Sequence, residues 1–256
     1  MTALITGASS GIGLELAKIH AQNGGNLVLV ARNIQKLNEL KQKFESKFNI
    51  AVYVIGKDLT LPNAAQDVYN EIVTQKLNID YLMNNAGFGD NHAFADADWN
   101  KLKSMLDLNI SALAQMTYLF SNDMKLRGGG RILNTASVAA FMSGPYMANY
   151  CATKAYVLSL SNAVNYEMRK FGVSVTALCP GPTASQFWAV SEMEDSPYLK
   201  KINLPSAEYV AKCGYRAMLK GKRAIAPCWW NKFMIGAIRI LPKSLVISVA
   251  AKLMKK

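Results

Sequence analysis

The sequence has few residues that bind metals or form disulfides. It contains only two histidines, His20 and His92, and its four cysteines stand at positions 151, 179, 213 and 228, without a C-x-x-C pair. Because zinc sites need closely spaced Cys or His ligands, no metal site is expected. Cysteines without such pairing are typical of free thiols in a reducing compartment.

Long apolar runs are also missing. No uncharged apolar segment reaches the ~18 residues that a membrane span requires. The chain begins MTALITG, without the charged and apolar segments of a secretory signal, so we expect a cytoplasmic protein. With 51% hydrophobic and 18% charged residues among 256, the composition is that of a globular chain with a sizeable core.

Acidic residues are scarce in the last fifth of the chain. Residues 200–256 contain 13 Lys and Arg but the single acid Glu208, whereas residues 1–199 contain 16 charges of each sign. The whole excess of positive charge therefore lies near the C-terminus. Nucleic-acid binding is not expected, because only Trp229, Trp230 and Phe233 supply aromatic rings beside the basic residues.

Residues 231–256 form a basic, apolar extension, which Pro242 is expected to divide into two short helices. Two roles are open for it. The helices could pack over a ligand cleft or a subunit interface with their lysines in water, which we favour. Alternatively, they could make a weak peripheral contact with an anionic membrane surface.

Short β-branched runs alternate with longer helical stretches along the chain. The runs have no polar face, which indicates a parallel sheet covered on both sides by helices. We predict an α/β fold with a doubly wound, Rossmann-type parallel sheet of about seven strands, forming one domain over residues 1–256. The expected strands are 3–6, 26–31, 50–55, 79–84, 131–136, 173–179 and 223–227. The expected helices are 11–23, 33–48, 62–77, 97–126, 149–171 and 206–220.

The first strand leads into the glycine-rich turn TGASSGIG, with Gly7, Gly11 and Gly13. Glycines at such a turn allow the backbone to approach a pyrophosphate closely. The N–H groups and dipole of a helix beginning near Ile12 would stabilise the phosphate charge. The turn therefore predicts a dinucleotide site.

Motifs in order along residues 2–183 resemble those of the short-chain dehydrogenase/reductase family, in its single-domain branch. The resemblance is strongest to bacterial NADP-dependent carbonyl and ketoacyl reductases. It implies a homo-oligomer, either a dimer or a tetramer. The residues that carry it are Thr6-Gly7-Ala8-Ser9-Ser10-Gly11-Ile12-Gly13, Asn84-Asn85-Ala86-Gly87, Asn109, Ser137, Tyr150-x3-Lys154 and Pro180-Gly181.

The resemblance also implies roles for individual residues. Lys154 would hold the nicotinamide ribose, and Asn109 would continue a proton relay through water. Asn85 would stabilise the sheet. Asp58 and Leu59 match the family's adenine-site pair, although Asp58 could equally be a solvated turn residue. The implied cofactor-binding set is Gly7, Ser9, Ser10, Gly11, Ile12, Gly13, Asp58, Leu59, Asn85, Ala86, Gly87, Tyr150, Lys154, Pro180, Gly181 and Thr183.

Tyr150 and Lys154 are the Tyr-Lys pair that can join a third catalytic group. Ser137 ends the strand before their helix, and the intervening loop can bring its hydroxyl beside Tyr150. Two other pairs share the spacing. One lies on or just after a strand, which sets its members roughly 13 Å apart, and the other lacks a partner hydroxyl; they are Tyr53/Lys57 and Tyr166/Lys170.

The residues predict carbonyl chemistry. Lys154, one turn after Tyr150, is expected to favour the phenolate and so ease proton donation from a group whose usual pKa is about 10. Tyr150 is then the general acid. Hydride transfer to a carbonyl builds negative charge on oxygen, and Ser137 can donate a hydrogen bond to it.

The end of the second strand, LVLVARN, predicts the cofactor. Enzymes that select NAD place an acid there for the ribose hydroxyls, whereas a 2′-phosphate needs a cation. Arg32 follows Ala31 with no acid nearby, and Asn33 is a further candidate contact. NADP(H) is therefore the expected cofactor.

We expect an NADPH-dependent reductase of an apolar ketone, aldehyde or ketoacyl compound, working in reverse on the alcohol. The alternative is a non-catalytic nucleotide-binding redox sensor on the same fold, which should lack the tyrosine or the lysine. Apolar candidates for the substrate pocket are Phe88, Phe94, Phe141, Met142, Tyr146, Phe187, Trp188 and Met193. Each of these could instead be core.

Overall fold

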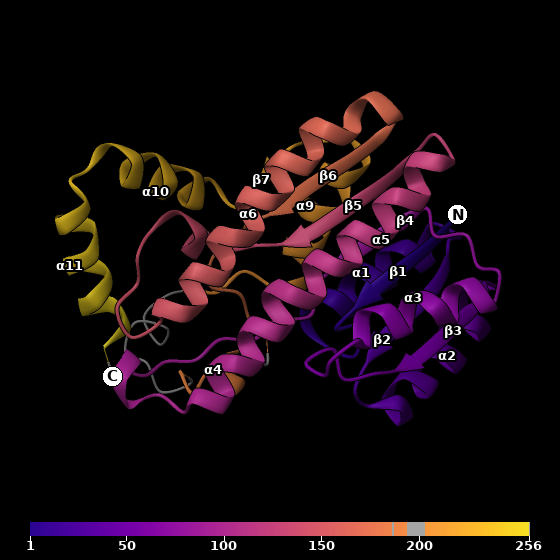
Figure 1. The fold of residues 1–256 in the computed structure, drawn as a ribbon, viewed down its shortest axis with the longest axis horizontal. Helices are drawn as coiled ribbons and strands as arrows, with labels where there is room; N and C mark the ends of the chain where they lie inside the picture. The colour runs from indigo at the N-terminus through magenta and orange to yellow at the C-terminus, as the bar shows by residue number, and fades with distance from the viewer. Residues whose placement is uncertain (186, 194–202, 256) are drawn as a thin grey trace.

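The protein is built on a seven-stranded parallel sheet with the strand order β3-β2-β1-β4-β5-β6-β7 (Figure 1). The computed structural model describes residues 1–185, 187–193 and 203–255. Every strand pair is parallel, so a helical crossover follows almost every strand, as predicted for a doubly wound α/β fold. The strands are β1 (Thr2–Thr6), β2 (Asn26–Ala31), β3 (Val52–Gly56), β4 (Tyr81–Asn84), β5 (Gly130–Thr135), β6 (Val173–Leu178) and β7 (Ala224–Ile225).

Helices cover both faces of the sheet. Alternating residues of β1 show the division, because Ala3 and Ile5 belong to one buried cluster and Leu4 to the other. The first cluster includes residues of α1 (Gly11–Gln22), α2 (Ile34–Phe48) and α9 (Ala207–Leu219). The second includes residues of α3 (Ala64–Thr74), α5 (Leu113–Leu126) and α6 (Ala148–Met168).

The predicted helix 97–126 is in fact three segments. α4 (Trp99–Leu106) and α5 are joined by a π-helical segment, Asp107–Ala112, which contains Asn109. Such widened turns are frequent at functional sites, and hydrophobic periodicity alone does not reveal them. The last predicted strand is also shorter than expected, because only Ala224 and Ile225 pair with β6.

The C-terminal extension forms α10 (Trp229–Ile240) and α11 (Lys243–Met254), with Pro242 between them, as predicted. The two helices arch away from the sheet at one end of the molecule (Figure 1). Within the described part of the chain, no helix combines the length and hydropathy needed to cross a bilayer. The short elements are the 3-10 turns Phe94–Asp96, Val138–Phe141 and Arg169–Phe171, and α7 (Phe187–Val190).

Candidate active site

A large cavity, with a volume of about 830 Å³, lies at the carboxyl ends of the parallel strands. Open α/β sheets bind ligands at this edge. The predicted cofactor residues gather there from five strand ends, which are far apart in sequence. Those that line the cavity are Gly7, Ser9, Ser10, Gly11, Ile12, Arg32, Asn33, Asp58, Leu59, Asn85, Ala86, Gly87, Tyr150, Lys154, Pro180, Gly181 and Thr183.

The glycine turn between β1 and α1 fits a phosphate group. Gly7 has a φ of +66° and Gly11 a φ of +53°, in the left-handed region that favours glycine. Gly13 does not line the cavity, but a Cβ there would lie 2.3 Å from the Gly7 carbonyl oxygen. Ser10 caps α1 without a side-chain cap hydrogen bond, so its hydroxyl and the first N–H groups of the helix can receive an anion.

Asn85 connects the end of β4 to β1, which is the sheet-stabilising position predicted for it. The Thr6 hydroxyl oxygen accepts hydrogen bonds from the backbone N–H groups of Asn85 and Ala86, both at 3.0 Å. The Asn85 amide donates to the Thr6 carbonyl at 3.3 Å. These bonds fix the backbone that faces the nucleotide side of the cavity.

Asn84, whose role the sequence did not specify, makes a second buried connection. Its amide nitrogen donates to Thr117 Oγ1 of α5 at 3.1 Å and to Asn134 Oδ1 of β5 at 2.9 Å. Asn134 in turn donates to Ser161 Oγ of α6 at 3.0 Å. Polar residues at buried strand positions were the available signal, because such groups must find hydrogen-bond partners.

The structure places Arg32 at the cavity rim with its side chain exposed and with no hydrogen bond or ion pair to any described residue. Asn33 caps α2, where its Oδ1 accepts from the Lys36 N–H at 2.9 Å. Asp58 Oδ1 accepts from both the backbone and the hydroxyl of Thr60, at 3.0 and 2.8 Å. Asp58 is thus a turn residue that also lines the cavity, and its role at the adenine stays a prediction.

Ser137, two residues after the end of β5, lies beside Tyr150 of α6, as predicted. Both are buried at the cavity wall. The pKa of Tyr150 is raised above its usual 10 mainly by burial, and the neighbouring Ser137 hydroxyl partly opposes this. Tyr150 is therefore protonated at neutral pH, which suits a proton donor.

Lys154 lies one turn after Tyr150, with its ammonium 5.7 Å from the centre of the Tyr150 ring. It donates a hydrogen bond to the Thr135 carbonyl at 2.8 Å. Burial lowers the pKa of Lys154 to about 8. The expectation that Lys154 lowers the pKa of Tyr150 is wrong for this structure, because desolvation dominates both groups and the ammonium lies over the ring.

Asn109 is fully buried behind the cavity rather than in its wall. Its amide nitrogen donates to the Phe88 carbonyl at 2.9 Å and to Thr153 Oγ1 at 3.1 Å, and its Oδ1 accepts from the Phe88 N–H at 3.2 Å. Its side chain therefore holds the loop after β4 against α6. The glycine of that loop, Gly87, fits because a Cβ would lie 2.9 Å from Asn109 Oδ1.

The loop after β6 closes the cavity beside Ser137. The Pro180 carbonyl accepts hydrogen bonds from the Val138 N–H at 2.9 Å and from Ser137 Oγ at 3.4 Å. Thr183 Oγ1 donates to the Gly181 carbonyl at 2.9 Å. The Trp188 indole donates to the Thr183 carbonyl at 2.7 Å, which connects this loop to α7.

Five of the eight apolar candidates for the substrate pocket line the cavity. The side chains that line the cavity are Phe88, Met142, Phe187, Trp188 and Met193. Three predicted residues do not line it. Phe94 is 62% exposed on a 3-10 turn, Phe141 packs in a separate cluster beneath Arg239, and Tyr146 is half-buried with a φ of +64°. Aromatic identity alone could not separate these positions from lining ones.

The sequence did not specify which residues of the C-terminal extension would line the cavity. Met234 and Ile238 line it from α10, four residues apart on one helix face, and Leu241 lines it just after the helix ends. Val246, Val249, Ala250, Leu253 and Met254 line it from α11. The extension therefore covers the cleft with one apolar face, which is the role favoured from the sequence.

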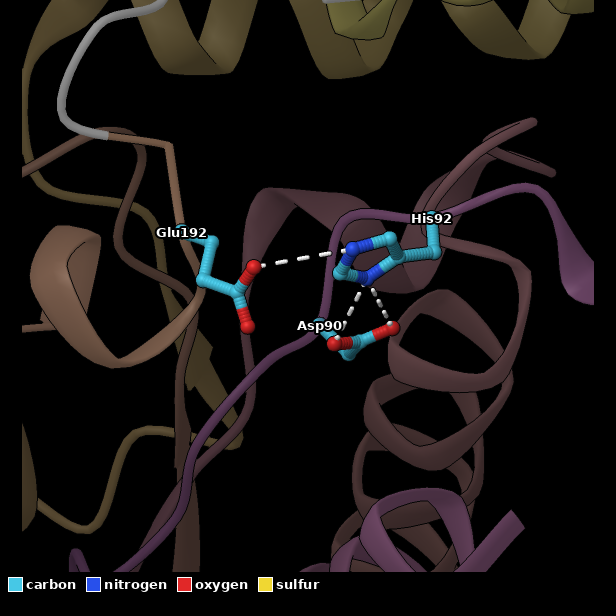
Figure 2. Close-up of side chains that lie close together, drawn as sticks. All are labelled: Asp90, His92 and Glu192. Atoms are coloured by element: carbon cyan, nitrogen blue, oxygen red, sulfur yellow. Dashed lines mark hydrogen bonds and ion pairs between the residues drawn. The ribbon is translucent and has the colours of Figure 1, made fainter. Parts of the chain in front are cut away.

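An ion-pair cluster, Asp90, His92, Lys101 and Glu192, borders the substrate side of the cavity. Figure 2 shows His92 between the two carboxylates, with Nδ1 3.1 Å from Asp90 and Nε2 3.5 Å from Glu192. Lys101 Nζ lies 2.8 Å from Asp90 and 2.7 Å from Glu192. The ammonium supplies the charge that a metal would supply between these carboxylates, so the cluster works as a salt-bridge network joining α4 to the α7 segment.

Comparison with known proteins gives the family. A profile described as short chain dehydrogenase matches residues 1–195. The chain belongs to the short-chain dehydrogenase family. Its family relatives include a very-long-chain 3-oxoacyl-CoA reductase-like protein of Arabidopsis thaliana, which is 30% identical over 249 residues, 95% of this chain and 78% of the relative.

Two solved structures of the family are similar along most of the chain. A short-chain dehydrogenase from Sphingobium yanoikuyae in complex with NADPH is 27% identical, with a TM-score of 0.83, covering 94% of this chain and 96% of its own. The bulky-bulky ketone specific alcohol dehydrogenase from Comamonas testosteroni is also 27% identical, with a TM-score of 0.79 and 95% coverage of both chains. The chain is therefore an oxidoreductase of this family.

Proposed function

We propose that the protein is an NADPH-dependent reductase that converts the carbonyl of an apolar ketone, aldehyde or ketoacyl compound to an alcohol, reversibly. The proposal rests on one observation: Tyr150, Ser137 and Lys154 all line the wall of an apolar cavity. Turnover would require all three groups in one place. A nucleotide sensor would not.

Each side chain has a chemical role in this reaction. A bound nicotinamide would supply the hydride. Tyr150 donates its phenolic proton to the carbonyl oxygen, and Ser137 donates a hydrogen bond to the same oxygen as negative charge develops there. Lys154 holds a positive charge beside them and is within reach of the ribose side of the cavity. Asn109 positions the Phe88 loop, and the relay of protons past it stays a prediction.

The charges of the cavity wall support NADP(H) over NAD. Its side chains include four cations, Arg32, Lys57, Lys101 and Lys154, and one acid, Asp58. Asp58 already accepts a hydrogen bond from the Thr60 hydroxyl, and Lys57 forms an ion pair with Asp67 at 2.5 Å. Arg32 is thus the cation available for a 2′-phosphate, as a charge-assisted pair. The NADPH complex of the Sphingobium relative gives independent support.

An apolar substrate suits the remaining part of the cavity. Its wall there is formed by Phe88, Phe187, Trp188 and the inner faces of α10 and α11. The names of the relatives point the same way, toward 3-oxoacyl-CoA and bulky ketone substrates. Apolar pockets with a few polar groups at one end are the usual form of such sites.

The deciding experiment follows NADPH oxidation with a panel of aliphatic ketones, aldehydes and 3-oxoacyl thioesters. We expect turnover that increases with the apolar length of the substrate and disappears in Tyr150→Phe. If NADPH binds but no member of the panel is reduced by the parent protein, the sensor alternative is favoured and the reductase proposal fails.

We also propose a domain organisation, a location and an oligomeric state. The chain is a single domain over residues 1–256, since one sheet and its helices enclose the cavity. It works in the cytoplasm, where the four free cysteines stay reduced. It forms a homo-oligomer through apolar residues exposed on α5 and α6, namely Tyr118, Leu126, Tyr156 and Tyr166. Size-exclusion chromatography with light scattering tests the last.

A further inference from the structure

The C-terminal helices α10 and α11 have a second apolar face, which does not line the cavity. We call it the outer face: Trp229, Trp230, Phe233, Ile240 and Ile247, exposed by 72%, 57%, 61%, 86% and 38%. Its three aromatic rings contact one another, with centroid distances of 5.4 Å for Trp229–Trp230 and for Trp230–Phe233. Large apolar side chains in such a group mark an interaction site.

The outer face is accompanied by positive charge only. Residues 229–256 contain six Lys and Arg and no Asp or Glu. Lys232, Arg239, Lys243, Lys252 and Lys255 are exposed, and none of them makes an ion pair with a described carboxylate. A partner that covers this face must therefore bring negative charge together with an apolar surface.

We propose that the outer face docks the protein on the surface of an anionic lipid bilayer. Indole and phenyl rings partition into the interface between headgroups and acyl chains, while lysines contact anionic headgroups. Each helix has only 12 residues, so the pair would lie in the plane of the interface rather than span it. The two helices lie at one end of the molecule, away from the sheet (Figure 1), and the side chains of the outer face are exposed.

The charge pattern disfavours the other occupants. A second copy of the chain would place its five exposed cations against the five of the first copy, and like charges repel in an interface without counter-charge. A single-stranded nucleic acid could contact the cations with its phosphates and stack its bases on the aromatic rings, but it would not bury the exposed aliphatic residues Ile240 and Ile247. An anionic bilayer can contact the cations with its headgroups and bury both the aromatic rings and the aliphatic side chains.

Docking would also bring the cavity to the bilayer. The inner faces of α10 and α11 line the cavity, so the same two helices would contact the cavity on one face and the bilayer on the other. An apolar substrate dissolved in lipid could then enter between them without crossing water. This last step rests on the proposed function, whereas the docking itself does not.

The test is co-sedimentation of the full chain with sucrose-loaded vesicles of phosphatidylcholine, with and without phosphatidylglycerol, over a series of salt concentrations. We expect binding to the anionic vesicles at low salt that weakens steeply as salt screens the lysines. Neutralising Lys243→Gln and Lys252→Gln should each lower the partition coefficient about fivefold. The triple variant Trp229→Ser, Trp230→Ser, Phe233→Ser should abolish binding.

Two controls make the result specific. Trp99→Ser with Phe94→Ser removes aromatic residues of similar exposure, 63% and 62%, from α4 and the 3-10 turn before it, and should leave vesicle binding unchanged. None of the substituted residues lines the cavity, so NADPH binding by every variant reports that it is folded.

Three results would overturn the docking proposal. They are no binding of the parent protein to anionic vesicles at low salt, equal loss of binding in the control variant, and a parent protein that binds no vesicles but whose triple variant has a smaller molecular mass in solution. The last would assign the outer face to contacts between copies of the chain. Because none of these readouts uses turnover, failure of the reductase proposal and failure of docking are distinguishable.

Discussion

The cavity has a proposed nucleotide-binding side at the glycine turn and a proposed substrate-binding side beneath α10 and α11, and the two sides are built differently. On the nucleotide side, buried hydrogen bonds fix the strand ends, as in the bonds from Asn85 and Ala86 to the Thr6 hydroxyl. On the substrate side, helices α10 and α11 line the cavity with side chains that remain half-exposed, such as Leu245 at 49% and Leu253 at 43%. A site for a constant ligand is held by backbone geometry, whereas a site for an apolar substrate is held by side-chain contacts that can rearrange.

The proposed catalytic residues lie where the two sides meet, and their loss should give the largest effect. Tyr150→Phe keeps the packing of the ring but removes the transferable proton. We expect the rate of carbonyl reduction to fall about 10²- to 10⁴-fold, with NADPH affinity nearly unchanged, measured by steady-state kinetics and fluorescence titration. The matched control is Tyr166→Phe, on the same helix and also four residues before a lysine, but 85% exposed. An equal loss in both variants would contradict the assignment.

A glycine-to-alanine substitution on each side of the cavity tests whether the backbone there can accept an added methyl group. Gly13→Ala forces a Cβ to within 2.3 Å of the Gly7 carbonyl oxygen, so we expect a loss of about 1–3 kcal/mol in the free energy of unfolding and weaker NADPH binding. Gly236→Ala on α10 meets no atom within 4 Å and should stabilise the helix by about 0.5–1 kcal/mol. Urea unfolding of both variants checks this. Equal destabilisation would show that the two sides are equally rigid.

Cofactor selection should depend on one cation of the nucleotide side. Arg32→Asp removes the available partner of a 2′-phosphate and adds repulsion. A charge-assisted bond contributes about 1.5–3 kcal/mol, so the preference for NADPH over NADH should fall about 10- to 100-fold. Lys57→Gln, whose parent side chain already pairs with Asp67, serves as the control with a smaller change. An unchanged ratio of dissociation constants in Arg32→Asp would place the phosphate elsewhere.

The pH dependence should report on Lys154. Its pKa is lowered to about 8 by burial, whereas that of Tyr150 is raised, so Lys154 loses its proton first as the pH rises. Reduction should therefore be constant below pH 8 and fall by at most about tenfold per pH unit above it, because a single charge is lost. A profile of kcat/KM against pH measures this. A profile that stays flat well beyond that point would show that the charge of Lys154 is not needed.

The smallest effect is expected at the salt-bridge network of the substrate side (Figure 2). Glu192→Gln removes an exposed carboxylate that pairs with Lys101 at 2.7 Å, while the pair of Lys101 with buried Asp90 stays. Exposed pairs contribute about 0.2–1 kcal/mol, so KM for a bulky carbonyl should rise by up to about fivefold, with kcat and NADPH affinity unchanged. A lower kcat with an unchanged KM would contradict this positioning role.

The sequence by itself predicted the fold and the glycine turn because both depend on local pattern. Strand 26–31 was predicted at its observed bounds, and Gly7, Ser10 and Gly11 were assigned correctly to the turn between β1 and α1. Buried parallel strands need continuous apolar runs, and a tight turn needs glycine, so each requirement is written in a few neighbouring residues. The pairing of Ser137 with Tyr150 could be predicted for the same reason, since one short loop joins their elements.

Only the tertiary structure decided the substrate side. It placed Phe88 in the cavity and excluded Phe94, Phe141 and Tyr146, and it assigned a separate face of α10 and α11 to the cavity and another to the exterior. It also showed that burial raises the pKa of Tyr150, whereas the sequence predicted that Lys154 would lower it. These outcomes depend on which elements meet in space and how much water they exclude, and side chains far apart in the sequence decide both.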